Sequence, residues 1–173
     1  HFKNIKESGL VSRTSTMTRE QICKKLDIPN DKKIVLFALG GSKKLLNPIQ
    51  NCDCTFLSIN SQLNFDNVTD VSNWVEGQNL VHASDLVICK CGYGFVSECL
   101  VNGTPFYYVA SNHHAEQMAI SNYLANIGFN NRISFDEINS LNISEKLFSQ
   151  TSNKKLANDT PNTVNYILEY LKH

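Results

Sequence analysis

The feature that most constrains the fold is a continuous apolar run, Ile34–Leu39, followed at once by Gly40-Gly41-Ser42. A strand without polar alternation has both faces buried, as in a parallel sheet covered by helices on each side. Four shorter apolar runs follow, at Thr55–Ile59, Val68–Val71, Leu86–Cys89 and Phe106–Val109. The segments between them can hold helices or long turns. The chain is therefore predicted to be an α/β protein with a Rossmann-like open parallel sheet and helices on both faces.

Helix signals lie around these strands. Thr18 and Gln21 have the spacing of a capping box and predict a short helix that runs to Leu26. Further helices are predicted over Gln78–Ser84, Phe95–Asn102, Glu116–Asn126 and Pro161–Leu171. The stretch from Ser42 to Thr55 leaves room for only a small helix.

Two of these helices carry apolar residues at helical spacing. In the helix over residues 116–126 we expect one face to pack on the sheet, formed by Met118, Ala119, Tyr123, Leu124 and Ile127. The last helix has an apolar stripe of Val164, Ile167, Leu168 and Leu171.

Composition excludes several classes of function. A chain of 173 residues, 42% of them hydrophobic, suits one compact domain. The 16 basic residues balance the 16 acidic ones, so no net field attracts nucleic acid or an anionic membrane. The sequence contains neither an apolar run of about 18 residues nor a charged-then-apolar leader, and we expect a cytoplasmic protein. Because the first residue is His1 and not Met, the chain reads as a piece of a longer one.

The cysteines include two Cys-x-Cys pairs, Cys52 with Cys54 and Cys89 with Cys91. Structural zinc sites more often use Cys-x2-4-Cys, and free cysteine commonly serves as a small buried hydrophobe. In a cytoplasmic setting we therefore expect neither zinc sites nor disulfides.

Ligands in open parallel α/β sheets bind beyond the carboxyl ends of the strands, so the loops after the apolar runs hold the candidate site. In Gly40-Gly41-Ser42 the missing side chains let backbone N–H groups approach a phosphate, and the serine hydroxyl adds a donor. The same three residues also fit a tight turn without a ligand.

A second loop carries more information: Lys90-Cys91-Gly92-Tyr93-Gly94, continued by Phe95-Val96-Ser97-Glu98. The start of a helix presents N–H groups and a positive dipole end, which together with Lys90 suit a pyrophosphate. Glu98 lies about one turn into the helix, where a carboxylate can accept hydrogen bonds from both ribose hydroxyls. The alternative is that Glu98 only stabilises the helix dipole.

The segment KCGYGFVSECLVNGTPFYYV, followed by HHAEQ, resembles the donor-binding signature of nucleotide-sugar glycosyltransferases. It is similar to the C-terminal domains of the peptidoglycan N-acetylglucosaminyltransferase and of UDP-glycosyltransferases, which have two facing α/β domains, the GT-B fold. Ser8–Arg13 looks like the linker that enters this domain. The resemblance implies a connector over residues 1–17, a donor-binding domain over residues 18–173, and an N-terminal acceptor domain absent from this sequence.

The resemblance also implies roles for individual residues. The glycine loop with Gly92, Tyr93, Gly94 and Ser97 would hold the diphosphate, the position of Glu98 would bind ribose, and Gln117 with Glu116 would contact the sugar. Asn73 and Trp74 fall beside the base, where an indole can stack on uracil. His113 and His114 have no counterpart in the family; His113 is a candidate for contact with the sugar or diphosphate, against an ordinary surface loop. Lys90, Tyr93 and Gly94-Phe95 replace the usual His, Trp and Asn-Ser, which leaves the donor open.

The resulting prediction is the donor-binding domain of an inverting, metal-independent glycosyltransferase that takes a sugar from a UDP-sugar to an unknown acceptor. Its general base is expected on the other domain, so this chain supplies no catalytic residue and is inactive alone. No cofactor and no metal are expected. The expected partners are the UDP-sugar and the N-terminal domain, through which the protein can contact a membrane peripherally. Two alternatives stay open: a nucleotide-sugar epimerase of the same fold, and a non-catalytic sugar-nucleotide-binding module fused to another activity, as in some sugar kinases.

Overall fold

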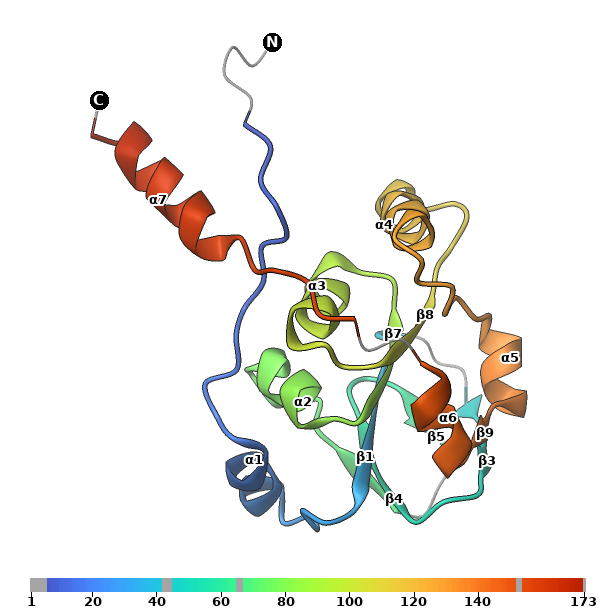
Figure 1. Ribbon diagram of the computed structural model, residues 1–173. Helices are drawn as coiled ribbons and strands as arrows, with labels where there is room; N and C mark the ends of the chain where they lie inside the picture. The colour runs from blue at the N-terminus through green and yellow to red at the C-terminus, as the bar shows by residue number, and fades with distance from the viewer. Residues whose placement is uncertain (1–5, 42–44, 65–66, 152–153, 173) are drawn as a thin grey trace.

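One five-stranded parallel sheet forms the centre of the protein. The computed structural model describes residues 6–41, 45–64, 67–151 and 154–172. The strands are β1 (Lys33–Ala38), β4 (Cys54–Ser58), β6 (Val68–Asp70), β7 (Leu86–Lys90) and β8 (Phe106–Val109), in the order β6-β4-β1-β7-β8 (Figure 1). All neighbours in this sheet are parallel, and each of the five predicted strands is confirmed.

The strand order reverses beside β1. The chain moves outward from β1 to β4 and β6, then returns to pair β7 with the other edge of β1 and continues to β8. The crevice outside the carboxyl ends of β1 and β7 is thus the topological switch point, where doubly wound folds bind their ligands.

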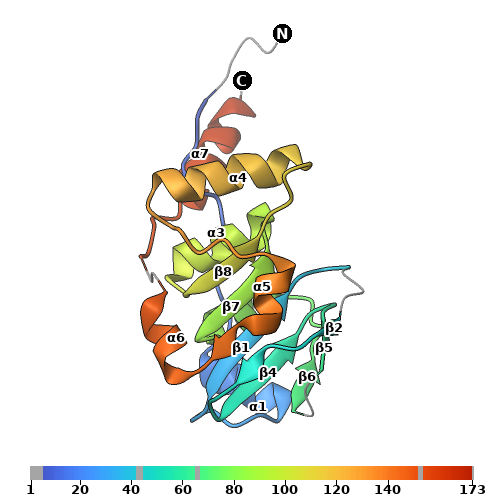
Figure 2. The same cartoon turned by 90° about the vertical axis from the view of Figure 1, so that its right-hand side faces the viewer.

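Both faces of β1 are buried, as its continuous apolar sequence predicts. Ile34, Leu36 and Ala38 belong to one core cluster, whereas Val35 and Phe37 belong to the other. The first cluster is covered by α1 (Arg19–Leu26), α2 (Gly77–Ala83), α3 (Tyr93–Asn102) and α4 (Ala115–Asn126), and the second by α5 (Phe135–Ser140) and α6 (Glu145–Gln150). Figure 2 shows α5 and α6 on the face of the sheet turned away from α1. The Rossmann-like fold with helices on both faces is confirmed.

Helix α1 begins with the predicted capping box. The Thr18 side chain accepts a hydrogen bond from the Gln21 amide, and the Gln21 side chain accepts one from the Thr18 amide at 2.9 Å. Asp27, with a φ of 53°, ends the helix in a left-handed conformation. Helix α3 starts two residues earlier than predicted and ends at Gly103, whose φ is 73°.

The segment expected to hold a small first helix is extended instead. β2 (Leu45–Leu46) pairs with β5 (Gln62–Leu63), and β3 (Ile49–Gln50) pairs with β9 (Asn142–Ile143). The prediction was wrong because Pro48 lies within this short stretch and disfavours a helical conformation at the residue before it. The amide of Ile49 donates to the Leu141 carbonyl at 2.8 Å, which ties the stretch to the segment that follows α5.

Helix α4 buries only part of the predicted face: Leu124 is buried and Ile127 packs against the core, as predicted, but the other buried positions differ. Gln117, Ser121 and Leu124 are buried, whereas Met118 and Tyr123 are 45% and 46% exposed. The Gln117 side chain accepts a hydrogen bond from the Ser111 amide at 2.8 Å, and the Ser121 hydroxyl lies 3.4 Å from the Tyr108 hydroxyl. Hydrogen bonding therefore orients this helix more than apolar spacing does.

The expectation that no disulfide forms was wrong for one pair. Cys52 and Cys54 are joined by a disulfide, while Cys23, Cys89, Cys91 and Cys99 are free and buried. Cys52 precedes β4 and is not part of an apolar strand, and the Cys54 amide donates to its carbonyl at 3.1 Å in a tight turn. Structural disulfides are typical of oxidising compartments, so this bond does not support the predicted cytoplasmic location. That location stays a prediction from the sequence.

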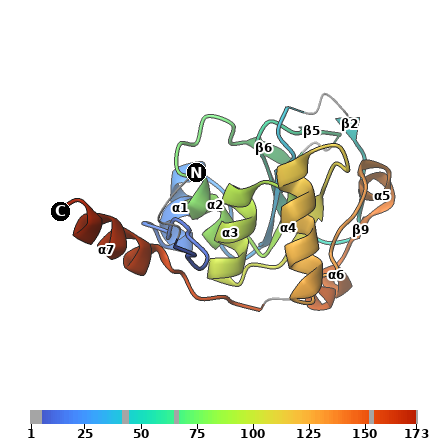
Figure 3. The ribbon, with the colours of Figure 1, turned by 90° about the horizontal axis from the view of Figure 1, so that it is seen from above.

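The last helix, α7 (Thr160–Tyr170), has Pro161 in its first turn, as predicted. It projects away from the sheet and the other helices (Figures 1 and 3). None of its residues is buried. Across the described ranges, no helix combines the length and hydropathy needed to cross a membrane.

Candidate functional site

A cavity of about 640 Å³ lies at the carboxyl ends of β1, β7 and β8, at the switch point of the sheet. We call it the switch-point cleft. Its lining residues are Leu39, Gly40, Gly41, Lys90, Val109, Ala110, Ser111, Gln117, Ser134 and Phe135. Candidate residues from three separate parts of the sequence thus come together there: Gly40 with Gly41, Lys90 and Gln117.

The loop after β1 requires its two glycines. Gly40 and Gly41 have φ angles of 53° and 58°, the left-handed region that favours glycine. A Cβ added at either position would meet no atom within 4 Å, so the backbone of this turn faces open space. Ser42, the third candidate in this loop, lies outside the described residues.

Lys90 is the last residue of β7, is exposed, and lines the cleft directly before the start of α3. Gly92 is the N-cap of α3, and Gly94 in the first turn leaves open space where a side chain would stand. The Tyr93 amide donates to Glu116 Oε1 at 3.4 Å. A carboxylate therefore already sits at the positive end of this helix dipole, at a position that suits an anion.

Gln117 is buried, with 4% of its surface exposed, at the start of α4. Its amide oxygen accepts from the Ser111 amide, so the amide nitrogen is the group that it can offer to a ligand. Burial raises the pKa of the Cys91 thiol to about 11, and this protonated thiol donates to the Gln117 carbonyl at 3.6 Å. These contacts fix Gln117 beside the residues that follow β7 and β8.

Glu98 faces away from the cleft, toward the connector that precedes α1. Its side chain is 2% exposed. The Arg13 guanidinium donates to Glu98 Oε1 through Nε at 2.9 Å, and Arg13 Nη2 lies 2.7 Å from the same oxygen. Burial raises the pKa of Glu98, and the charge and hydrogen bond of Arg13 oppose that rise. This geometry does not favour the alternative in which Glu98 only stabilises the helix dipole, because its carboxylate pairs with Arg13.

Tyr93 and Ser97 also point away from the switch-point cleft. Both line an apolar cavity of about 370 Å³ between α3, α4 and the connector. The Tyr93 hydroxyl accepts from the Val11 amide at 3.0 Å, and the Ser97 hydroxyl donates to the Gly94 carbonyl at 3.0 Å. Their hydrogen bonds hold the connector and the first turn of α3.

Asn73 and Trp74 line a separate cavity of about 210 Å³ together with Lys25. The Trp74 indole donates to the Glu76 carbonyl at 3.0 Å, and Lys25 Nζ lies 4.7 Å from the centre of the ring. The structure thus does not bring these residues to the cleft with Lys90, and the Lys25 ammonium already covers one face of the indole.

His113 and His114 are exposed in the loop between β8 and α4. The His113 amide donates to the Ser111 hydroxyl at 3.2 Å. This bond ties the backbone of His113 to Ser111, a lining residue of the cleft, but the His113 side chain does not line the cleft.

Sequence reasoning missed three contributors to the site. Arg132 donates through Nη2 to the Ala110 carbonyl at 3.0 Å and to the Asn112 side chain at 2.6 Å, and so supports the loop after β8. Ser134 and Phe135 close one side of the cleft at the start of α5. Ser134 and Glu137 have the spacing of a capping box, which could have marked the start of α5, whereas no comparable motif marks Arg132.

The cleft therefore offers a cation, a glycine turn, a helix start and a buried amide, which together suit a phosphate with a polar group attached. In the part of the chain that the structure describes, no group of three or more His, Cys, Asp or Glu residues is arranged to hold a metal ion. The absence of a metal requirement stays a prediction.

Comparisons with known proteins bear on the family and the fold of this chain. Residues 19–167 match the model of the glycosyltransferase family 28 C-terminal domain. L-arabinokinase from Arabidopsis thaliana is 26% identical over 129 residues, which cover 71% of this chain and 12% of that protein. The crystal structure of the glycosyltransferase SnogD from Streptomyces nogalater aligns with a TM-score of 0.52 and 17% identity, over 68% of this chain and 35% of that one. The chain thus spans only a small part of the kinase and about a third of SnogD.

Proposed function

Since the chain belongs to the glycosyltransferase family 28 C-terminal domain family, we propose that it is the donor-binding domain of a glycosyltransferase that uses a UDP-sugar. The observation that carries this proposal is the meeting of Gly40, Gly41, Lys90 and Gln117 in one cleft at the switch point of the sheet. This is the position at which doubly wound folds bind nucleotides.

In the proposed complex the diphosphate lies between the glycine turn and the start of α3. The Lys90 ammonium supplies a full positive charge, and the helix dipole adds a partial one. The diphosphate takes the place of the Glu116 carboxylate, whose bond to the Tyr93 amide is long at 3.4 Å. Glu116 is then free to accept a hydrogen bond from a hydroxyl of the sugar, beside the Gln117 amide. Because Lys90 and the helix dipole together offset much of the diphosphate charge, we propose transfer of a hexose without a metal ion.

Glu98 is proposed to accept hydrogen bonds from the ribose. Its carboxylate lies one turn beyond the start of α3, on the same helix whose N-terminus would hold the diphosphate. Transfer to the acceptor is proposed to need a facing N-terminal domain that supplies the general base.

A second candidate function is favoured by one comparison. The relative from Arabidopsis thaliana is named as a kinase, and this chain matches only 12% of it. The chain can therefore serve instead as a sugar-nucleotide-binding module attached to another activity. This candidate predicts donor binding without glycosyl transfer, even in the full-length protein.

Calorimetry with UDP and with uridine tests the proposed donor site. Lys90→Ala should weaken UDP by about 1.5–3 kcal/mol, the usual value of a hydrogen bond to a charged group, and should leave uridine nearly unchanged. Glu98→Gln should weaken both ligands by about 1–3 kcal/mol, because it removes a charged acceptor from the ribose. Lys24→Ala, which removes an exposed lysine of α1, is the matched control. Equal loss of UDP and uridine in Lys90→Ala would assign Lys90 a structural role and would count against a diphosphate in the cleft.

A further inference from the structure

An ion pair with an unusual geometry links the connector to helix α3. Glu98 is 2% exposed while its partner Arg13 is 60% exposed, so the guanidinium lies between the carboxylate and solvent. Both Arg13 contacts, from Nε at 2.9 Å and from Nη2 at 2.7 Å, fall on the same oxygen, Oε1. Within the described residues, no hydrogen bond is found on Oε2.

Arg13 is the cation that faces this carboxylate in the described part of the chain. On α3 itself the nearest titratable group is the buried Cys99 thiol, whose pKa is raised well above its ordinary value by burial, so the thiol is neutral. Helix α2, which packs on α3, carries His82, which is exposed. Glu76 before α2 accepts a hydrogen bond from the Asn79 side chain at 2.9 Å. Burial raises the pKa of Glu98, and only Arg13 lowers it.

The backbone around Arg13 is held by the segment that leads into α7. The Ser12 amide donates to the Thr160 hydroxyl at 3.0 Å and to the Asn158 side chain at 3.2 Å. The Ser12 carbonyl accepts from the same two side chains, each at 3.0 Å. The Asp159 amide donates to the Leu10 carbonyl at 2.7 Å. This clasp fixes the direction in which the Arg13 side chain leaves the connector, so an exposed side chain can hold a defined geometry.

We propose that Arg13 is a positioning residue for the donor: it holds the Glu98 carboxylate ionised and oriented through Oε1, so that Oε2 accepts a hydrogen bond from a ribose hydroxyl. The proposal rests on the proposed function, in which Glu98 binds the ribose. An ionised carboxylate is a stronger acceptor than a protonated one, and burial alone disfavours ionisation. The nucleoside part of the donor therefore depends on a residue of the connector as well as on the α3 motif.

The test is the pH dependence of uridine binding, measured by calorimetry on the wild type, Arg13→Met, Arg13→Lys and Glu98→Gln. Uridine carries no phosphate, so a direct contact of Arg13 with a diphosphate cannot affect the result. Wild-type affinity should fall as the pH drops and Glu98 takes up a proton. In Arg13→Met the midpoint of this loss should move up by about 1 pH unit or more, the usual effect of removing an adjacent opposite charge. In Arg13→Lys the pH midpoint should return much of the way to the wild-type value.

Glu98→Gln should bind uridine weakly at every pH, and Arg13→Met should cause no further loss in that background. Lys6→Met is the matched control, since the Lys6 ammonium belongs to the same connector but lies over the Tyr166 ring at 4.1 Å. An unchanged midpoint in Arg13→Met would overturn the proposal. Tighter uridine binding by Arg13→Met at every pH would overturn it too, because Arg13 would then block Glu98.

A ligand-free measurement separates the two proposals. NMR titration of ¹³C-labelled glutamate carboxyl groups, with Glu98→Gln to assign the signal, follows Glu98 directly. A wild type that binds neither uridine nor UDP would refute the proposed donor site. The midpoint of the Glu98 titration should shift upward in Arg13→Met and partly return in Arg13→Lys. This result would still support the proposal that Arg13 keeps the Glu98 carboxylate ionised. If Arg13→Met does not fold, Arg13→Lys alone decides, since a compact ammonium cannot make both guanidinium contacts and should give a smaller shift.

Discussion

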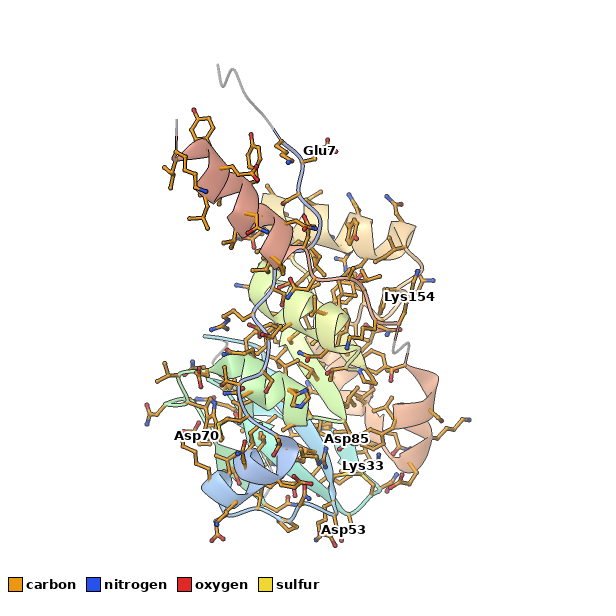
Figure 4. All side chains as sticks on the ribbon, turned by 60° about the vertical axis from the view of Figure 1, so that its left-hand side comes forward. Glu7, Lys33, Asp53, Asp70, Asp85 and Lys154 are labelled. Atoms are coloured by element: carbon orange, nitrogen blue, oxygen red, sulfur yellow. A yellow bond between two sulfur atoms is a disulfide. The ribbon has the colours of Figure 1, made fainter. Side chains whose placement is uncertain are left out.

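Asp85 is the residue on which the amino-terminal edge of the sheet depends most clearly. Its Oδ2 accepts from the Ile34 amide and from Arg19 Nη1, each at 2.9 Å, and its Oδ1 accepts from Lys33 Nζ at 2.9 Å. Lys33 and Asp85 are labelled beside one another in Figure 4. Burial would raise the pKa of Asp85, but the Ile34 amide, the Lys33 ammonium and Arg19 outweigh it, and the pKa lies below its ordinary value.

Asp85→Asn should therefore destabilise the domain by about 1–3 kcal/mol at pH 7, because it removes charged hydrogen bonds from a half-buried group. A carboxyl group with a lowered pKa contributes stability above the pKa of the unfolded chain, near 4, and loses it as the pH falls through the folded pKa. The difference between Asp85→Asn and the wild type should accordingly shrink below about pH 4. Urea unfolding at several pH values measures both effects.

Asp53→Asn is the control for this prediction. The Asp53 side chain is 79% exposed and pairs with Lys32 at 2.7 Å, and an exposed pair of this kind contributes about 0–1 kcal/mol. An Asp85→Asn variant no less stable than Asp53→Asn would show that the Asp85 contacts are not a support of the fold.

At the scale of single residues, local motifs could be predicted and distant partners could not. Lys90 could be named because it ends an apolar strand, and Gln117 because HHAEQ resembles the donor-binding signature; both line the cleft. The partner of Glu98 could not be predicted, since Arg13 is 85 residues away in the chain. Asn73 and Trp74 line a different cavity because the position of a loop depends on what packs beneath it.

Among the secondary-structure elements, the strands β1, β4, β7 and β8 could be predicted from apolar runs that suit a doubly covered sheet, and the edge strand β6 from the shorter stretch Val68–Val71. Helices α1 and α7 could be predicted from a capping box and from a proline in the first turn. The pairing of β3 with β9 joins residues 49–50 to residues 142–143, and two-residue strands leave no periodicity to detect. The buried face of α4 could be predicted only at Leu124, because its other two buried residues, Gln117 and Ser121, are polar.

The disulfide beside β3 gives a prediction at this scale. Cys52 and Cys54 are separated by 2 positions, so their bond closes a very short loop and restricts the unfolded chain little. The loop-entropy relation gives about 1.6 kcal/mol for a three-residue loop. Reduction with dithiothreitol should therefore lower the unfolding free energy by no more than about 2 kcal/mol. A loss above 4 kcal/mol in urea unfolding would show that the bond also supports β3 and β9.

At the scale of the whole molecule, helix α7 points to a partner surface. Val164, Ile167, Leu168 and Leu171 are 45%, 50%, 52% and 73% exposed, and they share the stripe predicted from the sequence. Figure 3 shows the helix extending beyond the outline of the sheet and its covering helices. An apolar stripe of this kind gains stability only when another surface covers it. We expect that surface to belong to the N-terminal domain that the proposed function requires.

The double variant Ile167→Glu, Leu168→Glu tests this expectation. In the isolated chain it should change the unfolding free energy by less than about 0.5 kcal/mol, as is usual for exposed positions. In the full-length protein it should lower the melting temperature or separate the unfolding of the two domains, because a charged stripe cannot be buried without cost. Calorimetry of both proteins measures this. A large loss in the isolated chain would show that α7 packs on its own domain.

The isolated chain is expected to bind the donor without transferring its sugar. Transfer needs a general base within hydrogen-bond reach of the acceptor hydroxyl, in a site that excludes water. Among the described residues that line the switch-point cleft, none carries a carboxylate or an imidazole, and Lys90 is the ionisable one. That ammonium is assigned to the diphosphate, so none of these described lining residues is available to take a proton from an acceptor. Slow hydrolysis of the donor is the most that these residues should support.

Incubation with radiolabelled UDP-sugars and a panel of lipid, glycan and small-molecule acceptors tests this expectation, first with the isolated chain and then with the full-length protein. Acceptor-dependent product should form only with the full-length protein. Lack of transfer by both, with donor binding intact, would favour the binding-module function instead. Turnover by the isolated chain would place the base within it. His113, His114 and Glu116 would then be the first residues to substitute, because they are exposed in the loop and first helical turn next to Gln117.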